Sequence, residues 1–224
     1  KASWIGIIGN AFLSSLKIIT GLLTGSLAVL SDGLDSMSDV LTSFITLIAA
    51  KIISRPPDVK FPYGYGKAES IAAKIISFVI FYAGTQLAFT AITRVIKGSH
   101  TEIPSKIAII ITIISIIGKL GLAFQQIKAG KSCNSEMLIA NGKNMQNDIL
   151  ISFSVLLGLV FTYVLKAPIL DAITGLLISI WILKIAFEIF IQTNYELMDG
   201  IKDASIYETI FNAIDEIKEV QNPH

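Results

Sequence analysis

The stretch Leu30-Ser31-Asp32-Gly33-Leu34-Asp35-Ser36-Met37-Ser38-Asp39 places three carboxylates in sequence that otherwise resembles the interior of a lipid bilayer. Asp35 and Asp39 are one helical turn apart and project from the same face, with Asp32 one turn earlier on nearly the same stripe. Ionisable side chains inside a membrane are costly and indicate a functional site. The alternative is that these acids cap a helix end or line a polar seam between helices.

A second pair with the same spacing, Asn144 and Asp148, lies in another apolar segment. Two helices would then each offer two oxygen-bearing side chains on one face. Carboxylate and amide oxygens suit a divalent cation. The sequence therefore predicts a cation site with four protein ligands: Asp35, Asp39, Asn144 and Asp148.

The composition is that of a membrane protein. Of the 224 residues, 53% are hydrophobic and 16% charged, and the mean hydropathy of +0.68 exceeds that of soluble domains. A net charge of +1 indicates no nucleic-acid partner. Cys133 is the only cysteine, and His100 and His224 lie outside the apolar segments, which excludes an internal disulfide and an imidazole-rich zinc site within the membrane.

Six apolar segments are long enough to span a bilayer, which predicts an all-α membrane protein with a six-helix transmembrane bundle. Prolines and glycines interrupt the chain after the second segment, and a polar connection is expected at 125–134. The predicted spans are residues 4–23, 27–53, 67–96, 105–124, 137–165 and 168–191.

Basic residues predict the orientation of these spans. The second loop is flanked by Lys51, Arg55, Lys60 and Lys67, and the fourth contains Lys128 and Lys131. Positive loops favour the cytoplasmic side, so both termini would also be cytoplasmic. The third loop, near Arg94, Lys97 and Lys106, is an exception. Spans two and five would run antiparallel, which pairs Asp35 with Asp148 in the outer half of the site and Asp39 with Asn144 in the inner half.

The predicted domain division is a transmembrane domain over 1–192 and, over 193–224, a linker with the first helix of a cytosolic domain. Asp203 begins this helix as an N-cap, and isoleucines then recur at helical spacing from Ile206 to Ile217. The sequence starts at Lys1 without Met and stops soon after this pattern begins, so we expect both ends to be cut from a longer chain.

An ordered set of features runs through the whole chain: Asn10 with Lys17, Gly25-Ser26, Asp35-xxx-Asp39, Phe61-Pro62-Tyr63-Gly64-Tyr65-Gly66-Lys67-Ala68-Glu69, Asn144-xxx-Asp148 and Glu196-Leu197-Met198-Asp199-Gly200. In this order the features resemble the cation diffusion facilitator family of divalent-metal/proton antiporters.

The resemblance implies a homodimer in the plasma membrane, with a ferredoxin-like cytosolic domain after the sixth helix. It implies export of a divalent cation by alternating access, driven by inward proton flow. Since no histidine lies in the apolar segments, we expect Asp35, Asp39 and Asp148 to carry the protons. No enzymatic activity and no prosthetic group are expected. Lys67 and Asp199 match charges that interlock near the dimer interface, although Lys67 alone also suits a snorkelling lysine. Asn10, Asp32 and Asn147 are further candidates to support the ligands.

Two departures from the family pattern bear on the metal. Asn144 stands where zinc-preferring members usually have histidine, and Phe61 and Tyr65 replace histidines of the second loop, so Asp58 receives no metal assignment. An all-oxygen ligand set predicts a broad range of divalent metals, including manganese, iron, zinc, cobalt, cadmium and nickel.

Two other classes of protein compete with a transporter. A CDP-alcohol phosphotransferase also carries paired aspartates on a membrane helix and binds divalent metal, but it needs an Ala-Arg dipeptide, and neither Arg55 nor Arg94 follows an alanine. The other class is a metal-sensing membrane protein that does not transport. A liposome metal-uptake assay separates all three classes.

Overall fold

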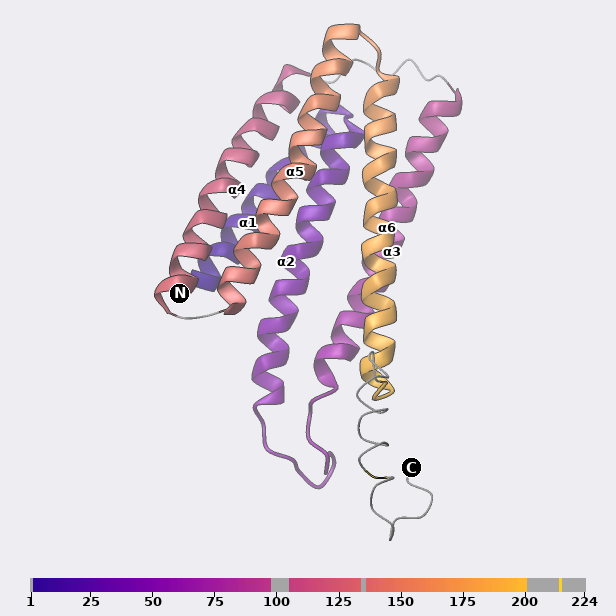
Figure 1. Ribbon diagram of the computed structural model, residues 1–224. Helices are drawn as coiled ribbons and strands as arrows, with labels where there is room; N and C mark the ends of the chain where they lie inside the picture. The colour runs from indigo at the N-terminus through magenta and orange to yellow at the C-terminus, as the bar shows by residue number, and fades with distance from the viewer. Residues whose placement is uncertain (1, 98–104, 134–135, 201–213, 215–224) are drawn as a thin grey trace.

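Six long helices run roughly side by side in the computed structural model (Figure 1), which describes residues 2–97, 105–133, 136–200 and 214. Each is long and apolar enough to cross a membrane. The described residues contain no strand, so the predicted all-α six-helix architecture is confirmed. The helices are α1 (Ala2–Thr24), α2 (Leu27–Ile53), α3 (Ala68–Lys97), α4 (Lys106–Ser132), α5 (Glu136–Leu165) and α6 (Ile169–Leu197).

Two helices extend beyond their predicted ends. The prediction of a polar connection at 125–134 is wrong over its first eight residues, because α4 continues to Ser132. The sixth helix likewise ends at Leu197 and not near residue 191. Gln, Lys and Ala are good helix formers, so hydropathy marks where a helix leaves apolar surroundings and not where it ends. The predicted cytosolic segment 193–224 lies mostly outside the described residues.

The turn between α1 and α2 fixes the start of the acidic helix. Gly25 has a φ of +68°, a left-handed conformation that favours glycine. The Ser26 hydroxyl then caps α2 by accepting from the backbone N–H of Val29 at 3.2 Å. Asp171, at the start of α6, accepts from the Ser26 hydroxyl at 2.6 Å and from the backbone N–H of Leu27 at 2.8 Å. These contacts join the beginnings of α2 and α6.

The helices pack around α2. One group contains α1, α4 and α5, in which α4 contacts both α1 and α5; α3 and α6 form a second, closely packed pair, and α2 contacts both groups (Figure 1). The buried apolar core joins the groups and includes Val29, Ile80, Val155, Leu159 and Ile182.

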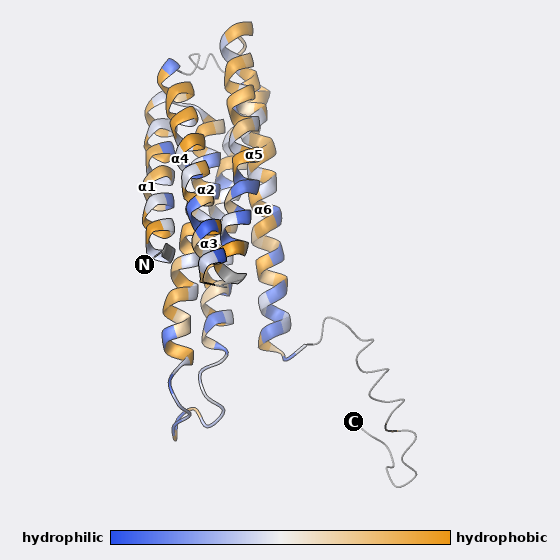
Figure 2. Ribbon diagram, turned by 60° about the vertical axis from the view of Figure 1, so that its left-hand side comes forward, coloured by the Kyte–Doolittle hydropathy of each residue, from blue (hydrophilic) through white to orange (hydrophobic). Residues whose placement is uncertain are grey.

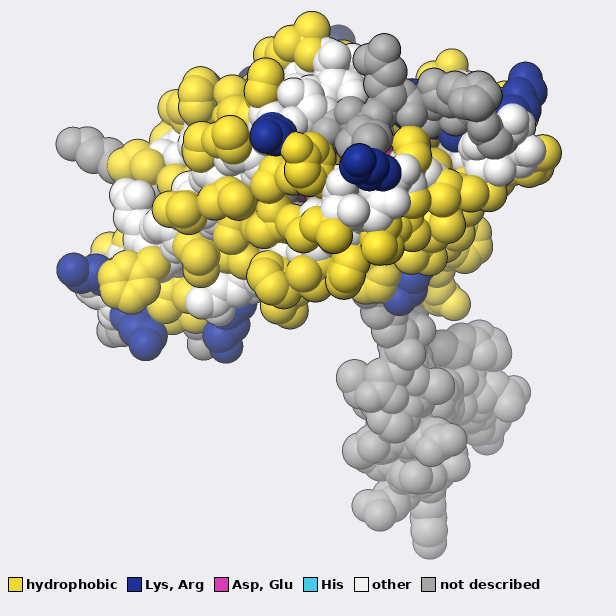
Figure 3. Space-filling view, turned by 90° about the horizontal axis from the view of Figure 1, so that it is seen from above, with side chains coloured by type: hydrophobic (Ala, Val, Ile, Leu, Met, Phe, Trp, Pro, Cys, Tyr) yellow, Lys and Arg dark blue, Asp and Glu magenta, His cyan; other side chains and the backbone are white. Residues whose placement is uncertain are grey.

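The outer surface suits a lipid environment. Many large apolar side chains are exposed, among them Phe12, Leu23, Phe89, Phe124 and Leu177. Figure 2 shows hydrophobic residues along most of the length of the helices, with hydrophilic residues near the middle of the bundle and on the lower part of α6. Viewed from above in Figure 3, apolar side chains also dominate, with scattered lysine and arginine. The polar groups of interest therefore lie within the bundle.

Candidate cation site

A cavity of about 360 Å³ lies among α1, α2, α3, α5 and α6. Its volume exceeds that of several water molecules, so a partly hydrated ion fits. Carboxylates, amides and hydroxyls contribute to the lining, which places many oxygen atoms around one space in an apolar bundle. These polar residues are Ser3, Asn10, Ser38, Asp39, Thr42, Ser43, Thr46, Asn141, Asn144 and Asp148.

The cavity brings together three of the four residues predicted as ligands. Asp39 comes from α2, and Asn144 and Asp148 come from α5. Asp35 does not line the cavity, and its side chain, 5% exposed, lies deeper in the bundle. Asp35 and Asp39 each interact electrostatically with Asp148. Like charges in a poorly solvated site repel one another, and a cation among them relieves that repulsion.

The ligands are not drawn together into a compact carboxylate cluster. Across the described ranges, no three Asp, Glu, His or Cys side chains lie close enough to hold one metal ion among them. Asn144 would therefore have to contribute, or α2 and α5 would have to move closer together. A cation site that opens and closes is consistent with this spacing.

A buried lysine forms an ion pair with Asp148. Lys119 of α4 is 1% exposed, and its Nζ lies 2.9 Å from Asp148 Oδ2 and 3.1 Å from the Ser36 Oγ, to which it donates. The sequence reasoning missed Lys119. The signal was available, because Lys119 is the only charged residue between Ile107 and Gln126, and such a residue inside a membrane needs a partner.

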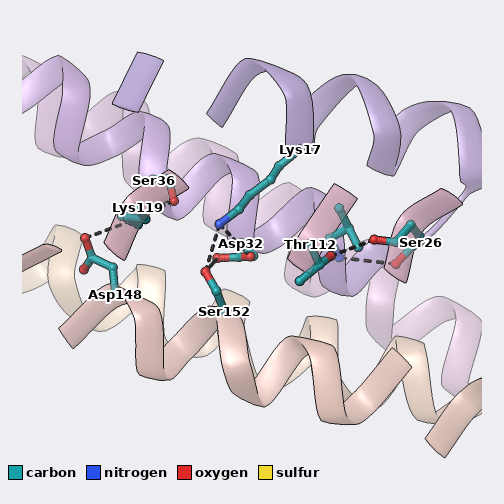
Figure 4. Close-up of polar contacts among 10 residues, drawn as sticks. Lys17, Ser26, Asp32, Ser36, Thr112, Lys119, Asp148 and Ser152 are labelled. Atoms are coloured by element: carbon teal, nitrogen blue, oxygen red, sulfur yellow. Dashed lines mark hydrogen bonds and ion pairs between the residues drawn. The ribbon is translucent and has the colours of Figure 1, made fainter. Parts of the chain in front are cut away.

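A second buried lysine neutralises Asp32. Lys17 of α1 lies 2.8 Å from Asp32 Oδ2 and donates to the Ser152 hydroxyl at 2.8 Å, and Ser152 in turn donates to Asp32 Oδ1 at 2.9 Å. Figure 4 shows this group separated from the Lys119–Asp148–Ser36 group. None of its three residues lines the cavity. The structure thus places Asp32 in a polar seam between helices. For this one aspartate, that is the alternative to a cation ligand given in the sequence analysis.

The two amides named as supporting candidates differ in position. Asn10 is 6% exposed, lines the cavity, and its Oδ1 has no hydrogen-bond partner in the described part of the chain. That oxygen is available to a cation or to water. Asn147 is exposed and does not line the cavity, so Asn10 is the better placed of the two.

A larger hollow of about 770 Å³ lies between α2, α3 and the end of α6, and its lining includes Lys67, Glu69, Glu196 and Asp199. Thr42, Thr46 and Ile189 belong to the linings of both this hollow and the inner cavity. The two spaces are therefore neighbours along the bundle.

Lys67 and Asp199 meet within one chain. The Lys67 ammonium contacts the Asp199 carboxylate and donates to the backbone carbonyl of Glu196. Lys67 is partly exposed and Asp199 largely exposed, and α3 begins at the residue after Lys67. The pair therefore ties the start of α3 to the end of α6.

Asp58 lies in the loop after α2, where groups of the same loop donate hydrogen bonds to its carboxylate. Its carboxylate accepts from the backbone N–H groups of Lys60 and Phe61, both at 2.8 Å, and from the Tyr65 hydroxyl at 2.7 Å. These hydrogen bonds, chiefly that from Tyr65, lower the pKa of Asp58, and the bond raises the pKa of Tyr65. Asp58 orders the turn through these contacts.

Comparison with known proteins supports the reading of this arrangement. Residues 3–198 match the family described as the cation efflux transmembrane domain. A transporter of Methanocaldococcus jannaschii is 35% identical over 198 residues, covering 88% of this chain and 68% of the relative. The manganese efflux system protein MneS of Bacillus subtilis is 30% identical over 220 residues, covering 97% and 75%. The magnetosome protein MamB of a Magnetospira species is 29% identical over 222 residues, covering 99% and 74%.

Six apolar helices around a cavity that contains carboxylate and amide groups define an integral, multi-pass membrane protein of the cation-transporting class. The chain belongs to the cation efflux family, also called the cation diffusion facilitators, whose members move divalent metal cations and carry no prosthetic group. The resemblance drawn from the sequence is thereby confirmed.

Proposed function

We propose that this chain exports divalent transition-metal cations from the cytoplasm by alternating access, in exchange for protons. The observation that carries the proposal is the shared cavity of Asp39, Asn144 and Asp148, which come from two helices. Asp35 lies near enough to Asp148 to interact with it electrostatically. It would complete the set of four proposed ligands if α2 and α5 moved closer together. Buried carboxylates favour a cation because it replaces their lost hydration.

The position of the cavity, the engagement of the buried lysines and membership of a transporter family favour transport over the two alternatives. The hollow near Lys67 and the cavity that contains Asp39 share lining residues, so the cavity adjoins a second polar space nearer the end of the bundle, which supports access of a cation to the site. A membrane phosphotransferase would need cationic groups for phosphate, whereas Lys119 and Lys17 are both engaged with aspartates. Membership of a transporter family also favours movement of the ion over sensing alone.

For the cargo we propose a broad set of divalent metals that includes manganese, iron, zinc, cobalt, cadmium and nickel. The proposed ligands are all oxygen atoms, which harder and borderline cations accept. Two similar proteins of Bacillus subtilis, MneS and MneP, are named manganese efflux system proteins, which supports manganese as the first metal to test.

The proposed setting is a homodimer in the plasma membrane with both termini in the cytoplasm. Residues 1–192 would form the membrane domain and 193–224 the start of a cytosolic domain. In this orientation the hollow near Lys67 and Asp199 faces the cytoplasm. Their contact within one chain would brace α3 against α6 beside the dimer interface.

The test is manganese flux into proteoliposomes containing wild type, Asp39→Asn or Asp148→Asn. Each substitution removes one negative charge from the cavity with little change in size, and we expect flux to fall by at least about 100-fold, beyond the effect of losing a residue that only supports a ligand. Glu188→Gln is the matched control, because Glu188 is an exposed carboxylate of α6 that pairs with Lys184 and does not line the cavity. Normal flux in either folded aspartate variant would remove that residue from the site.

A further inference from the structure

Lys119 presents a positive charge to the same carboxylate that the proposed site offers to a metal. Its ammonium lies 2.9 Å from Asp148 Oδ2, and both side chains are almost completely buried. Asp35 and Asp39 take part in no ion pair among the described residues. Lys119 also interacts electrostatically with Asp35 and Asp39, but of the aspartates proposed as ligands only Asp148 forms an ion pair with a lysine in the described part of the chain.

We propose that Lys119 is a tethered competitor of the transported metal: its ammonium neutralises Asp148 when the site is empty and must leave that carboxylate when a cation binds. This inference rests on the proposed function of the site. A divalent cation bound at Asp148 would come within a few ångströms of the ammonium, and repulsion at that separation is strong in a poorly solvated interior. Either the lysine moves or the affinity for metal stays low.

The structure offers a place for the displaced ammonium. Ser36 of α2 already accepts a hydrogen bond from Lys119 at 3.1 Å, and it follows Asp35, whose carboxylate interacts electrostatically with Lys119. The lysine chain has four flexible carbons and three donors, so its ammonium can release Asp148 and keep Ser36. Exchange of one cation for another would limit the affinity of the site and speed release of the metal.

The other buried lysine provides a comparison within the same bundle. Lys17 makes a pair of nearly equal length with Asp32, 2.8 Å, and it also contacts a serine, Ser152. That pair does not line the cavity. A lysine with a purely structural role would stabilise the fold as Lys17 does, and its removal would not improve metal binding.

Manganese binding to the purified full chain, measured by equilibrium dialysis at one pH, tests the proposal. We expect Lys119→Met to bind manganese at least about tenfold more tightly than wild type, because the competing charge is gone, and to transport it with a lower maximal rate. Lys119→Arg keeps the charge and should bind within about threefold of wild type, a free-energy difference below about 1 kcal/mol. Lys17→Met should show no gain in affinity.

Ser36→Ala provides a second test that does not depend on removing the lysine. Without the serine hydroxyl the ammonium has fewer alternatives to Asp148, so manganese affinity should fall by about tenfold, the equivalent of one hydrogen bond to a charged group. Unchanged or weaker binding by folded Lys119→Met, or unchanged binding by Ser36→Ala, overturns the proposal. If wild type itself binds no manganese, the proposed function fails first, and the two failures are thereby distinguished.

Discussion

Asn144 is the proposed ligand at whose position the family resemblance leads us to expect histidine in zinc-preferring members. It lies in the cavity one helical turn from Asp148, and an amide oxygen gives zinc no particular advantage over manganese. An imidazole nitrogen at the same place suits zinc in tetrahedral geometry. The choice of metal is thus expected to depend on this single position.

We predict that Asn144→His shifts transport from a broad metal range towards zinc by roughly tenfold or more, the size of effect that changes around a metal site produce. Competition between zinc and manganese in a proteoliposome uptake assay measures the shift. Asn147→His is the matched control, since Asn147 lies on the same helix and outside the cavity. An equal shift in both variants, or none in Asn144→His, contradicts the role given to this residue.

The acidic run of α2 shows what residue spacing can and cannot predict. Helical periodicity correctly places Asp32, Asp35 and Asp39 on one helix. It does not show that the environments of the three carboxylates differ. Asp32 is neutralised by Lys17 and Ser152, and Ser152 is distant in the sequence. Such partners are determined by how helices pack, which a single helix pattern does not contain.

The close packing of helix α1 against helix α2 depends on Gly21. A Cβ atom there would lie 2.7 Å from the backbone of Leu30, closer than real side chains come. The position of the acidic helix therefore depends on a residue with no side chain.

We predict that Gly21→Ala destabilises the protein by about 1 to 3 kcal/mol, the usual cost of overpacking. Gly121→Ala is the control, because nothing lies within 4 Å of a Cβ at that helical position, and alanine favours helix more than glycine does. Thermal unfolding in detergent should show a lower midpoint for the first variant and an equal or higher midpoint for the second. Equal midpoints in the two variants would argue against the close contact.

Helix existence was predictable from hydropathy, whereas helix length and polar partners were not. All six predicted spans are present, because a bilayer requires long apolar segments. The continuation of α4 to Ser132 was missed because polar helix formers follow the apolar part. Lys119 was missed for a different reason: its partners Asp148 and Ser36 lie on other helices, so only tertiary packing identifies them.

For the whole molecule, the proposed exchange of metal for protons implies coupling to a pH gradient. When metal leaves a poorly solvated site, protons restore its neutrality, because an uncompensated buried charge is costly. We predict that proteoliposomes with an acidic interior accumulate manganese and that an ionophore which dissipates the pH gradient abolishes this accumulation. Asp148→Asn vesicles should not respond to the gradient. Wild-type flux that is indifferent to the gradient would exclude proton antiport.

The proposed transport requires that a divalent cation binds between α2 and α5 inside the membrane bundle. The most direct measurement is an anomalous difference map from crystals of the protein grown with manganese. We predict one strong peak within about 2.5 Å of oxygens of Asp39, Asn144 and Asp148, the range of metal–oxygen ligand distances, and loss of that peak in Asp39→Asn. A peak confined to the Asp58 loop or to the hollow near Glu69, with none in the cavity, would contradict it.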